Sequence, residues 1–459
     1  MSSVSSFHFT LLALIALLIP AQSPAFEATA AYGISKPPQI GAYLNAKLPP
    51  DQSGRLPAKI SDLGVFANPH ELTPATNLIP YELNVTFWSD GAAKSRWISF
   101  PSQDGPQAAK IGFAPEGPWK FPSGTVFVKH FELATDETRP EQRRRLETRF
   151  LVRNRTGGVY GLTYKWRPDN SDADLLETNL TENIVIRTTT GVRTQSWYYP
   201  SRKDCLACHT DQAGLVLGVK TSQLNRDTTY PNGIADNQLR AWNHLDWFEP
   251  SFTETEIPGF LRLAAATDLS RSLEDRARSY LDANCAHCHR PGGTVANFDA
   301  RYEIPLEKQK LIQGPVLIDQ GIDGAKVIAP NDLWRSILFL RANTTEAIKM
   351  PPLAHDVLDQ DSMALLKEWI QSLPGPTVLA PPKITPAGGN FAREVEVSLS
   401  SEEAGTTIHY TLDGSVPNKS DPVYTAPLKL TGPTVVRAKA YKPGSTRSIT
   451  VQGIFIVNE

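Results

Sequence analysis

Every cysteine of the chain lies in one of two copies of the same five-residue pattern, Cys-x-x-Cys-His, at residues 205–209 and 285–289. This spacing is typical of c-type haem attachment. Two thiols can each form a thioether with a haem vinyl group, and the histidine that follows can bind the iron as its proximal ligand. The sequence therefore predicts two covalently attached c-type haems, held by Cys205, Cys208 and His209 and by Cys285, Cys288 and His289.

Other uses of four cysteines fit the pattern less well. Two disulfides or a zinc ribbon would not require a histidine directly after both second cysteines. The pairs of a zinc ribbon usually lie about 15–20 residues apart, whereas these motifs lie 80 residues apart. A thiol–disulfide oxidoreductase needs one Cys-x-x-Cys pair, not two.

The N-terminus resembles a secretory signal peptide. Residues 11–19 are apolar, and Pro20 and a run of small residues follow, so cleavage is expected after Ala25. The first residues contain His8 but no Lys or Arg, so a retained anchor is the alternative, although the apolar run is short for a membrane span. We expect an exported, periplasmic protein that is soluble after removal of the peptide.

The length of 459 residues leaves room for about three domains of ordinary size. The net charge of −2 gives no reason to expect a nucleic-acid partner. Short apolar runs such as 125–128 and 148–152 predict strands, and Gly157-Gly158 predicts a hairpin. The expected order is a signal peptide (1–25), a β-rich N-terminal domain (26–195), a first haem-binding segment (196–268), a helical haem domain (269–373), a Pro-rich linker (374–386) and a β-sandwich (387–459).

Two features of these segments bear on the haems. Residues 196–268 are too few to bury a haem unaided, so we expect the first haem to pack against a neighbouring domain. The stretch 139–149 holds five arginines and two glutamates. It predicts a solvated face, and docking or contact with haem propionates is the alternative.

The segment 269–373 resembles a class I cytochrome c domain. The resemblance rests on a helix that enters the second motif, on the Lys-Met-Pro-Pro-Leu segment 349–353 and on the closing helix 365–370. It implies that Cys285 and Cys288 anchor the haem, that His289 is the proximal ligand and that Met350 is the distal ligand. Met363 lies on the amphipathic closing helix, where core packing is the expected role. A His–Met pair implies a fairly high potential.

The larger stretch 61–373 resembles an uncharacterised family of bacterial exported dihaem c-type cytochromes. The phrases that carry this resemblance are 80–84, 88–91, 121–131 and 204–210. The resemblance implies a haem protein and brings no established reaction.

Residues 382–458 resemble the C-terminal β-sandwich that follows chitobiase and related glycosidases, through the phrases 408–417, 422–424 and 436–441. This resemblance implies a structural or surface-attachment role, with weak carbohydrate binding as the alternative. The expected fold class is thus multidomain: a β-rich N-terminal domain, an α-helical cytochrome c domain and a C-terminal immunoglobulin-like β-sandwich.

The distal ligand of the first haem is open at this stage. His244 is the leading candidate because it is close to the first motif and is flanked by Trp242 and Trp247, which could wall a haem. His130, on an expected strand, comes second. The remaining candidates are His287, His70, His355 and no ligand at all.

The coordination of the first haem decides the functional class. Two six-coordinate haems would form a relay that passes single electrons between redox partner proteins, for example from a periplasmic dehydrogenase. An open iron would permit a dihaem peroxidase or oxidase. A third interpretation is a haem module of a polysaccharide-handling system, localised by its C-terminal domain. Electron transfer is the prediction, because the resemblance to cytochrome c implies both axial ligands at the second site.

Overall fold

The computed structural model describes residues 31–35, 43–52, 55–76, 78–101, 108–294 and 297–458. The expected signal peptide lies outside the described residues. Among the described residues, none of the helices has the length and apolar character needed to cross a membrane.

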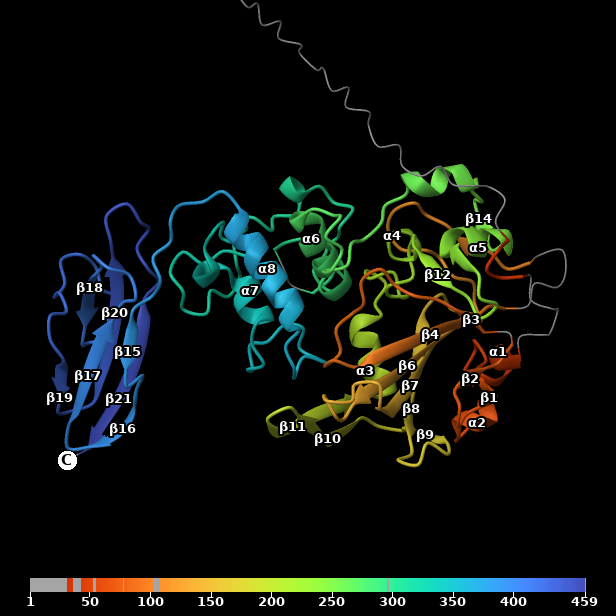
Figure 1. Ribbon diagram of the computed structural model, residues 1–459, viewed down its shortest axis with the longest axis horizontal. Helices are drawn as coiled ribbons and strands as arrows, with labels where there is room; N and C mark the ends of the chain where they lie inside the picture. Colours follow the sequence, from red (N-terminus) through yellow and green to blue (C-terminus); the bar gives the residue numbers. More distant parts are fainter. Residues whose placement is uncertain are drawn as a thin grey trace, which may run out of the picture. The chain divides into compact units, whose positions relative to one another are not determined.

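A six-stranded antiparallel sheet forms the centre of the N-terminal part, in the order β3-β4-β6-β7-β8-β9 (Figure 1). Its strands are β3 (Ile79–Pro80), β4 (Ala93–Ser99), β6 (Val126–Ala134), β7 (Arg143–Arg153), β8 (Val159–Trp166) and β9 (Ala173–Leu175). The expected strands at 125–128 and 148–152 and the hairpin at Gly157-Gly158 are confirmed as β6, β7 and the β7–β8 turn.

The two faces of this sheet have different surroundings, because successive side chains of a strand point to opposite sides. On β6, Val126 and Val128 pack into a core with Leu44 and Ile60. Lys129 lies on the other face and lines a cavity. The alternation along β6 therefore decides which residues can reach the first motif.

Shorter elements surround the sheet. They are the hairpin β10 (Leu180–Thr188) and β11 (Gly191–Tyr199), and the pairs β1 (Phe66–Asn68) with β2 (Thr73–Pro74), β5 (Ile111–Gly112) with β14 (Phe248–Glu249) and β12 (Asp227–Thr229) with β13 (Ala235–Asn237). The helices of this part are α1 (Tyr43–Lys47), α2 (Ile60–Leu63), α3 (Arg202–Cys208), α4 (Thr221–Leu224), α5 (Gln238–His244) and the 3-10 helix η1 (Glu254–Gly259).

The expectation of an α-helical cytochrome c domain at 269–373 is wrong. The described residues of this segment form three α-helices, α6 (Leu273–Asn284), α7 (Ile337–Ala342) and α8 (Gln360–Ser372), of 12, 6 and 13 residues. Two 3-10 turns, η2 (Leu306–Lys308) and η3 (Leu333–Arg335), accompany them. Between α6 and α7 the chain is irregular, because glycines and prolines recur from residue 291 to residue 330 and interrupt helices.

The three helices nevertheless share a core. Leu281 of α6 and Leu366, Trp369 and Ile370 of α8 are almost completely buried together. Met363 joins them at 3 % exposure, in the packing role expected for it. α6 ends at Asn284, because the backbone of the next residue, Cys285, leaves the helical region.

The C-terminal part is a two-sheet β-sandwich, as expected. One sheet has the order β15-β17-β19 and the other β16-β21-β20-β18. Their strands are β15 (Lys383–Thr385), β16 (Gly389–Ala392), β17 (Val395–Ser400), β18 (Thr407–Thr411), β19 (Leu428–Leu430), β20 (Thr434–Tyr441) and β21 (Val451–Asn458). β15 begins inside the segment expected to be a linker.

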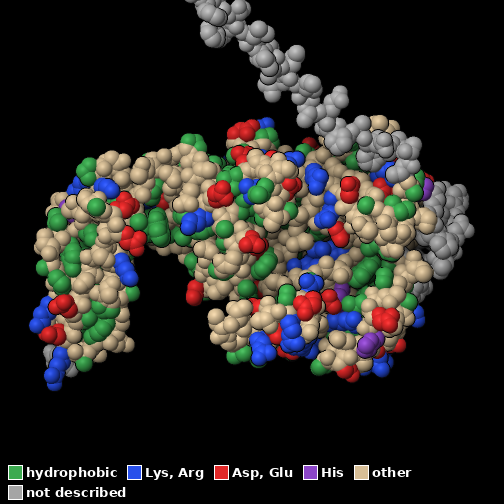
Figure 2. Space-filling view, in the orientation of Figure 1, with side chains coloured by type: hydrophobic (Ala, Val, Ile, Leu, Met, Phe, Trp, Pro, Cys, Tyr) green, Lys and Arg blue, Asp and Glu red, His purple; other side chains and the backbone are tan. Residues whose placement is uncertain are grey.

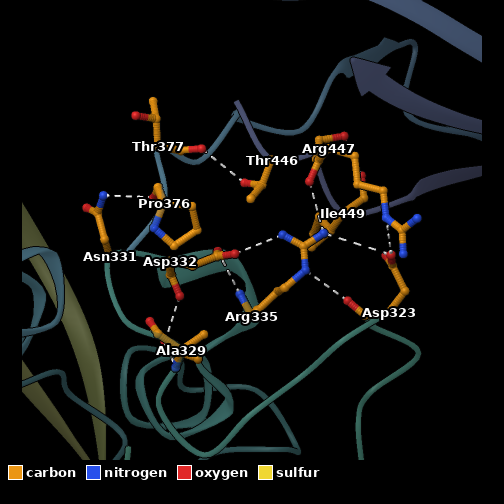
Figure 3. A network of polar contacts seen from close by, with 12 residues as sticks. Asp323, Ala329, Asn331, Asp332, Arg335, Pro376, Thr377, Thr446, Arg447 and Ile449 are labelled. Carbon is orange, nitrogen blue, oxygen red and sulfur yellow. Dashed lines mark hydrogen bonds and ion pairs between the residues drawn. The ribbon is translucent and has the colours of Figure 1, made fainter. Parts of the chain in front are cut away.

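A polar network joins this sandwich to the segment before α7 (Figure 3). The Asp323 carboxylate lies 2.7 Å from the Lys439 ammonium, 3.8 Å from Arg335 and 3.9 Å from Arg447. Arg335 also donates to the Arg447 carbonyl at 3.1 Å. Burial alone would raise the pKa of Asp323, but the hydrogen bond and charge of Lys439 outweigh burial and hold it below the ordinary value.

Candidate functional site

The first Cys-x-x-Cys-His motif lies on α3, directly after β11. Ser201 caps the helix: its hydroxyl accepts from the Asp204 amide, and the Asp204 carboxylate accepts from the Ser201 amide at 2.8 Å. α3 packs against β8, where Gly161 stands opposite Cys205. A Cβ on Gly161 would lie 2.7 Å from the Cys205 Cβ and even closer to its sulfur. The close seating of Cys205 on the sheet therefore requires glycine.

His209 is oriented by the loop that follows it. Its Nδ1 lies 2.6 Å from the Leu215 carbonyl oxygen, which can only accept, so Nδ1 carries the proton and Nε2 keeps a free lone pair. Burial lowers the pKa of His209 to about 4 and keeps the ring neutral. A neutral imidazole with Nδ1–H bonded to a carbonyl is the usual state of a metal-ligating histidine.

Cys205, Cys208 and His209 line a cavity between α3, the open face of the sheet and the loop 213–220. Its apolar lining includes Leu83, Phe87, Phe127 and Leu151, among other residues. A hollow opens beside α3 and β4 in Figure 2, and Lys and Arg side chains (blue) gather at it. The cavity thus combines two thiols, a neutral histidine, apolar walls and positive charge.

The second motif follows α6. The His289 ring stacks on Phe298, with 4.4 Å between ring centroids, and its buried Nδ1 has no hydrogen-bond partner among the residues that the structure describes. Burial, followed by the charge of Arg341, lowers the pKa of His289 to about 4. His289 is therefore also neutral, but it lacks the carbonyl acceptor that fixes the first histidine.

The two motifs lie side by side, a juxtaposition that the sequence analysis did not predict. His287 and Arg290 line the same cavity as Cys208 and His209. After burial, the largest influence on the pKa of Cys208 is Cys288, and the largest on that of His287 is His209. Groups that interact in this way are close neighbours in space.

Hydrogen bonds and one ion pair hold the motif-bearing segments together. The Arg290 guanidinium donates to the Gln212 carbonyl at 2.8 Å, directly after the first motif. Lys220 lies 2.7 Å from the Asp282 carboxylate of α6. The Trp88 amide donates to Asn284 Oδ1 at 2.7 Å, one residue before Cys285.

The segment 88–90 makes a second attachment beyond α6. The Asp90 carboxylate accepts from the amides of Asp356 and Val357 at 2.6 and 2.8 Å, and Trp88 Nε1 donates to the Val357 carbonyl at 2.7 Å. Burial raises the pKa of Asp90 to about 6, against the two amide bonds that lower it. Residues 88–91, which have no assigned role in the sequence, thus bind the chain both directly before the second motif and at residues 356–357.

Met350 is half-buried, and its amide donates to the Arg341 carbonyl at the end of α7 at 2.8 Å. Arg341 in turn influences the pKa of His289. Met350 and the second motif thus share Arg341 as a neighbour. The role of Met350 as distal ligand stays a prediction.

Four of the five candidate distal histidines do not line the cavity at the first motif. His244 stacks on Tyr32, with 3.7 Å between centroids. His130 is fully buried on the opposite face of the sheet and bonds Thr148 at 2.8 Å. His355 donates from Nε2 to the Ala342 carbonyl, and His70 is exposed. His287 lines the cavity.

The four thiols are free and protonated. All four cysteines are unpaired in the structure. Burial raises the pKa of Cys208 to about 11 and that of Cys285 to about 12, and it also raises those of Cys205 and Cys288. Redox-active thiols have the opposite shift. Among the described residues, no group of three or more His, Cys, Asp or Glu side chains is placed to hold a metal ion, whereas a zinc ribbon needs four such ligands.

Comparison with known proteins identifies the C-terminal part. Residues 386–452 match the chitobiase/beta-hexosaminidase C-terminal domain family. This match confirms the resemblance expected there and agrees with the two-sheet sandwich. No curated protein matches the chain. The family match does not extend to residues 32–373, so their resemblance to c-type cytochromes stays a prediction.

Proposed function

We propose that the chain carries two covalently attached c-type haems and passes single electrons between redox partner proteins. The observation that carries this proposal is the meeting of both Cys-x-x-Cys-His motifs at one cavity, although 80 residues separate them in sequence. A bound haem supplies an iron that changes its charge by one electron.

The residues at the first motif suit this role. Cys205 and Cys208 present protonated thiols to the cavity, and each S–H bond can add across a vinyl group without an external oxidant. His209 offers its free Nε2 from a ring that the Leu215 carbonyl holds in place. The apolar part of the lining favours a large planar apolar group.

His287, rather than His244, is our proposed sixth ligand of the first haem. It lines the cavity opposite α3 and packs edge-on against Phe87, with 5.5 Å between centroids. Among the described residues, no hydrogen bond to its ring nitrogens is found, so either nitrogen is available to bind iron. Because His287 belongs to the second motif, this ligation would join the two haem sites directly.

Haem content is the first test. Protein produced with a haem-attachment system should give two haems per chain in a pyridine haemochrome assay. The double variant Cys205→Ala/Cys208→Ala should give one, and the same change at Cys285 and Cys288 should also give one. A wild-type protein without covalent haem would refute the proposal.

Ligation of the first haem is tested with carbon monoxide. The reduced wild-type protein should bind little, because both irons have two axial ligands. His287→Ala should open one site, give a high-spin spectrum when reduced and bind carbon monoxide, whereas His244→Ala should behave like wild type. Ready binding by the wild type would instead favour the peroxidase or oxidase alternative. Opening by His244→Ala would restore His244 as the ligand.

The location and the C-terminal domain complete the proposal. Export to the periplasm, with a soluble mature chain, follows from the signal-peptide pattern and from the need to attach c-type haem outside the cytoplasm. The β-sandwich would position the protein through weak contact with carbohydrate or the cell surface. Deleting residues 386–459 should leave the haem spectrum unchanged and abolish any retention on chitin or cell-wall polysaccharide.

A further inference from the structure

Three basic residues form a row across the face of the sheet that lines the cavity. Arg96 on β4 is directly opposite Lys129 on β6, and Lys129 is directly opposite Arg149 on β7. All three side chains line the cavity. Like charges directly opposite each other on neighbouring strands destabilise a sheet. This row therefore needs a compensating charge.

The protein supplies only part of that charge. The fully buried Glu147 carboxylate binds Arg149 through two hydrogen bonds, of 2.9 and 2.5 Å. The Lys129 ammonium lies over the rings of Phe87 and Phe131, at 5.9 and 5.0 Å from their centroids. Among the described residues, it has no hydrogen-bonded or ion-paired partner.

Arg96 is the least compensated member of the row. It is 7 % exposed, and its buried Nη2 has no hydrogen-bond partner in the part of the chain that the structure describes. The nearby Glu82 carboxylate is held by Arg226 at 2.7 Å. A buried, unpaired guanidinium loses its hydration without replacement, which is unfavourable unless a ligand provides the missing acceptor.

The remaining charges at the cavity are already used. Lys220 pairs with Asp282 at 2.7 Å and with Glu303 at 3.8 Å, and Arg290 donates to backbone carbonyls. Among the described residues, Arg96 and Lys129 thus face the cavity without a counterion. Burial, followed by the charge of Arg96, holds the pKa of Lys129 well below its ordinary value, and a carboxylate bound beside it would favour its charged form.

We propose that Arg96 and Lys129, supported by Arg149, bind the carboxylate groups of a ligand with a large apolar body. A planar guanidinium matches a carboxylate better than an ammonium does, and the apolar wall beside the row can pack against the apolar body of a ligand. Two sources share this chemistry. One is the pair of propionates of a haem attached at Cys205 and Cys208, which rests on the proposed function, and the other is a free carboxylate ligand.

From the sequence, contact with propionates is only the alternative for the stretch 139–149. The structure separates the arginines of that stretch. Arg143 is exposed at the start of β7, whereas Arg149 lines the cavity. Arg96 and Lys129, on other strands, were not singled out as charged site residues.

The test uses the full mature protein with its haems and the variants Arg96→Gln and Lys129→Gln. Arg155→Gln, at an exposed position on the β7–β8 turn, is the matched control. Lys129→Arg keeps the positive charge and should behave like the wild type. Each protein is measured for haem content, for the reduction potential of each haem, and for succinate binding by calorimetry.

If the carboxylates are the haem propionates, both Gln variants should keep two haems. Reduction of the first haem should become about tenfold less favourable, which is about 59 mV for one electron, because a positive charge that favours the reduced iron is lost. Succinate should then have no effect on the wild type. If the carboxylate is free, the wild type should bind succinate saturably, and both Gln variants should bind it at least tenfold more weakly.

The inference is overturned if Arg96→Gln and Lys129→Gln match Arg155→Gln in both potential and succinate binding. A protein without haem would refute the proposed function but not the row of cations, because calorimetry with succinate still tests the second source. The two failures are therefore distinguishable.

Discussion

Asp90→Asn should stabilise the protein at neutral pH. Asp90 is 3 % exposed, and its Oδ1 accepts two amide hydrogen bonds, from Asp356 and Val357. An asparagine amide oxygen can accept the same two bonds without carrying a charge. Asp90 has a φ of 49°, and asparagine tolerates this left-handed conformation better than most residues. The substitution therefore removes the buried charge and keeps the geometry.

The magnitude follows from the pKa. Burial raises the pKa of Asp90 from 3.8 to about 6 in the folded protein, a difference that corresponds to about 3 kcal/mol. Because the folded pKa lies above the unfolded one, the stability that protonation provides is fully present below pH 3.8 and is lost as the pH rises through about 6. Asp90→Asn should thus gain about 3 kcal/mol at pH 7 and less than about 1 kcal/mol at pH 4.

Amide hydrogen exchange at residues 355–358, together with urea unfolding between pH 4 and pH 8, measures this difference locally and globally. Asp90→Ala is the matched control. It leaves the amides of Asp356 and Val357 without their acceptor, at about 1–3 kcal/mol each, and should be destabilising at every pH. The reasoning is refuted if Asp90→Asn is less stable than wild type at pH 7, or if its gain is the same at pH 4.

Two further substitutions test the packing of the motif and the attachment of the C-terminal domain. Gly161→Ala should displace Cys205, destabilise the protein by about 1–3 kcal/mol and lower the haem content at the first motif. Gly259→Ala, with open space around its Cβ position, should have none of these effects. Equal melting temperatures and haem contents of the two variants would contradict the steric argument. Asp323→Asn should leave the Lys439 ammonium, which is 3 % exposed, without its ion pair. We expect this change to weaken the attachment of the C-terminal sandwich by about 2 kcal/mol, which limited proteolysis would detect as faster cleavage. Because the pKa of Asp323 is lowered in the folded protein, the stabilising effect is present above pH 3.8 and is lost as the pH falls through the folded pKa, so wild type and variant should converge in acid.

Local patterns in the sequence predicted local structure well. Apolar residues at helical spacing indicated α6, and alternating runs indicated β6 and β7, because the periodicity of burial depends only on neighbouring residues. The same reasoning overestimated the helical content of residues 269–373. Helical phrases around both ends suggested an α-helical domain, but the Gly- and Pro-rich chain between α6 and α7 forms no α-helix among its described residues.

The candidate site depended on contacts that no local pattern reveals. His244 was favoured because Trp242 and Trp247 flank it, but both tryptophans are buried in a hydrophobic core instead of lining the cavity. His287 was one candidate among several, and its position beside the first motif comes from tertiary bonds such as that between Arg290 and Gln212. The row of Arg96, Lys129 and Arg149 likewise requires the register of three strands.

Residues of both motifs line one cavity, so two haems bound there would influence each other. After burial, Cys288 is the largest influence on the pKa of Cys208, and His209 is the largest on that of His287, so a charge added at one motif is felt at the other. Reduction of one haem adds a negative charge, which makes reduction of the second less favourable at a short distance in a low-dielectric interior. The two potentials of the protein would then belong to the coupled pair rather than to either haem alone. A variant that removes one haem should therefore shift the potential of the remaining haem, and an unchanged potential would show that the two sites work independently.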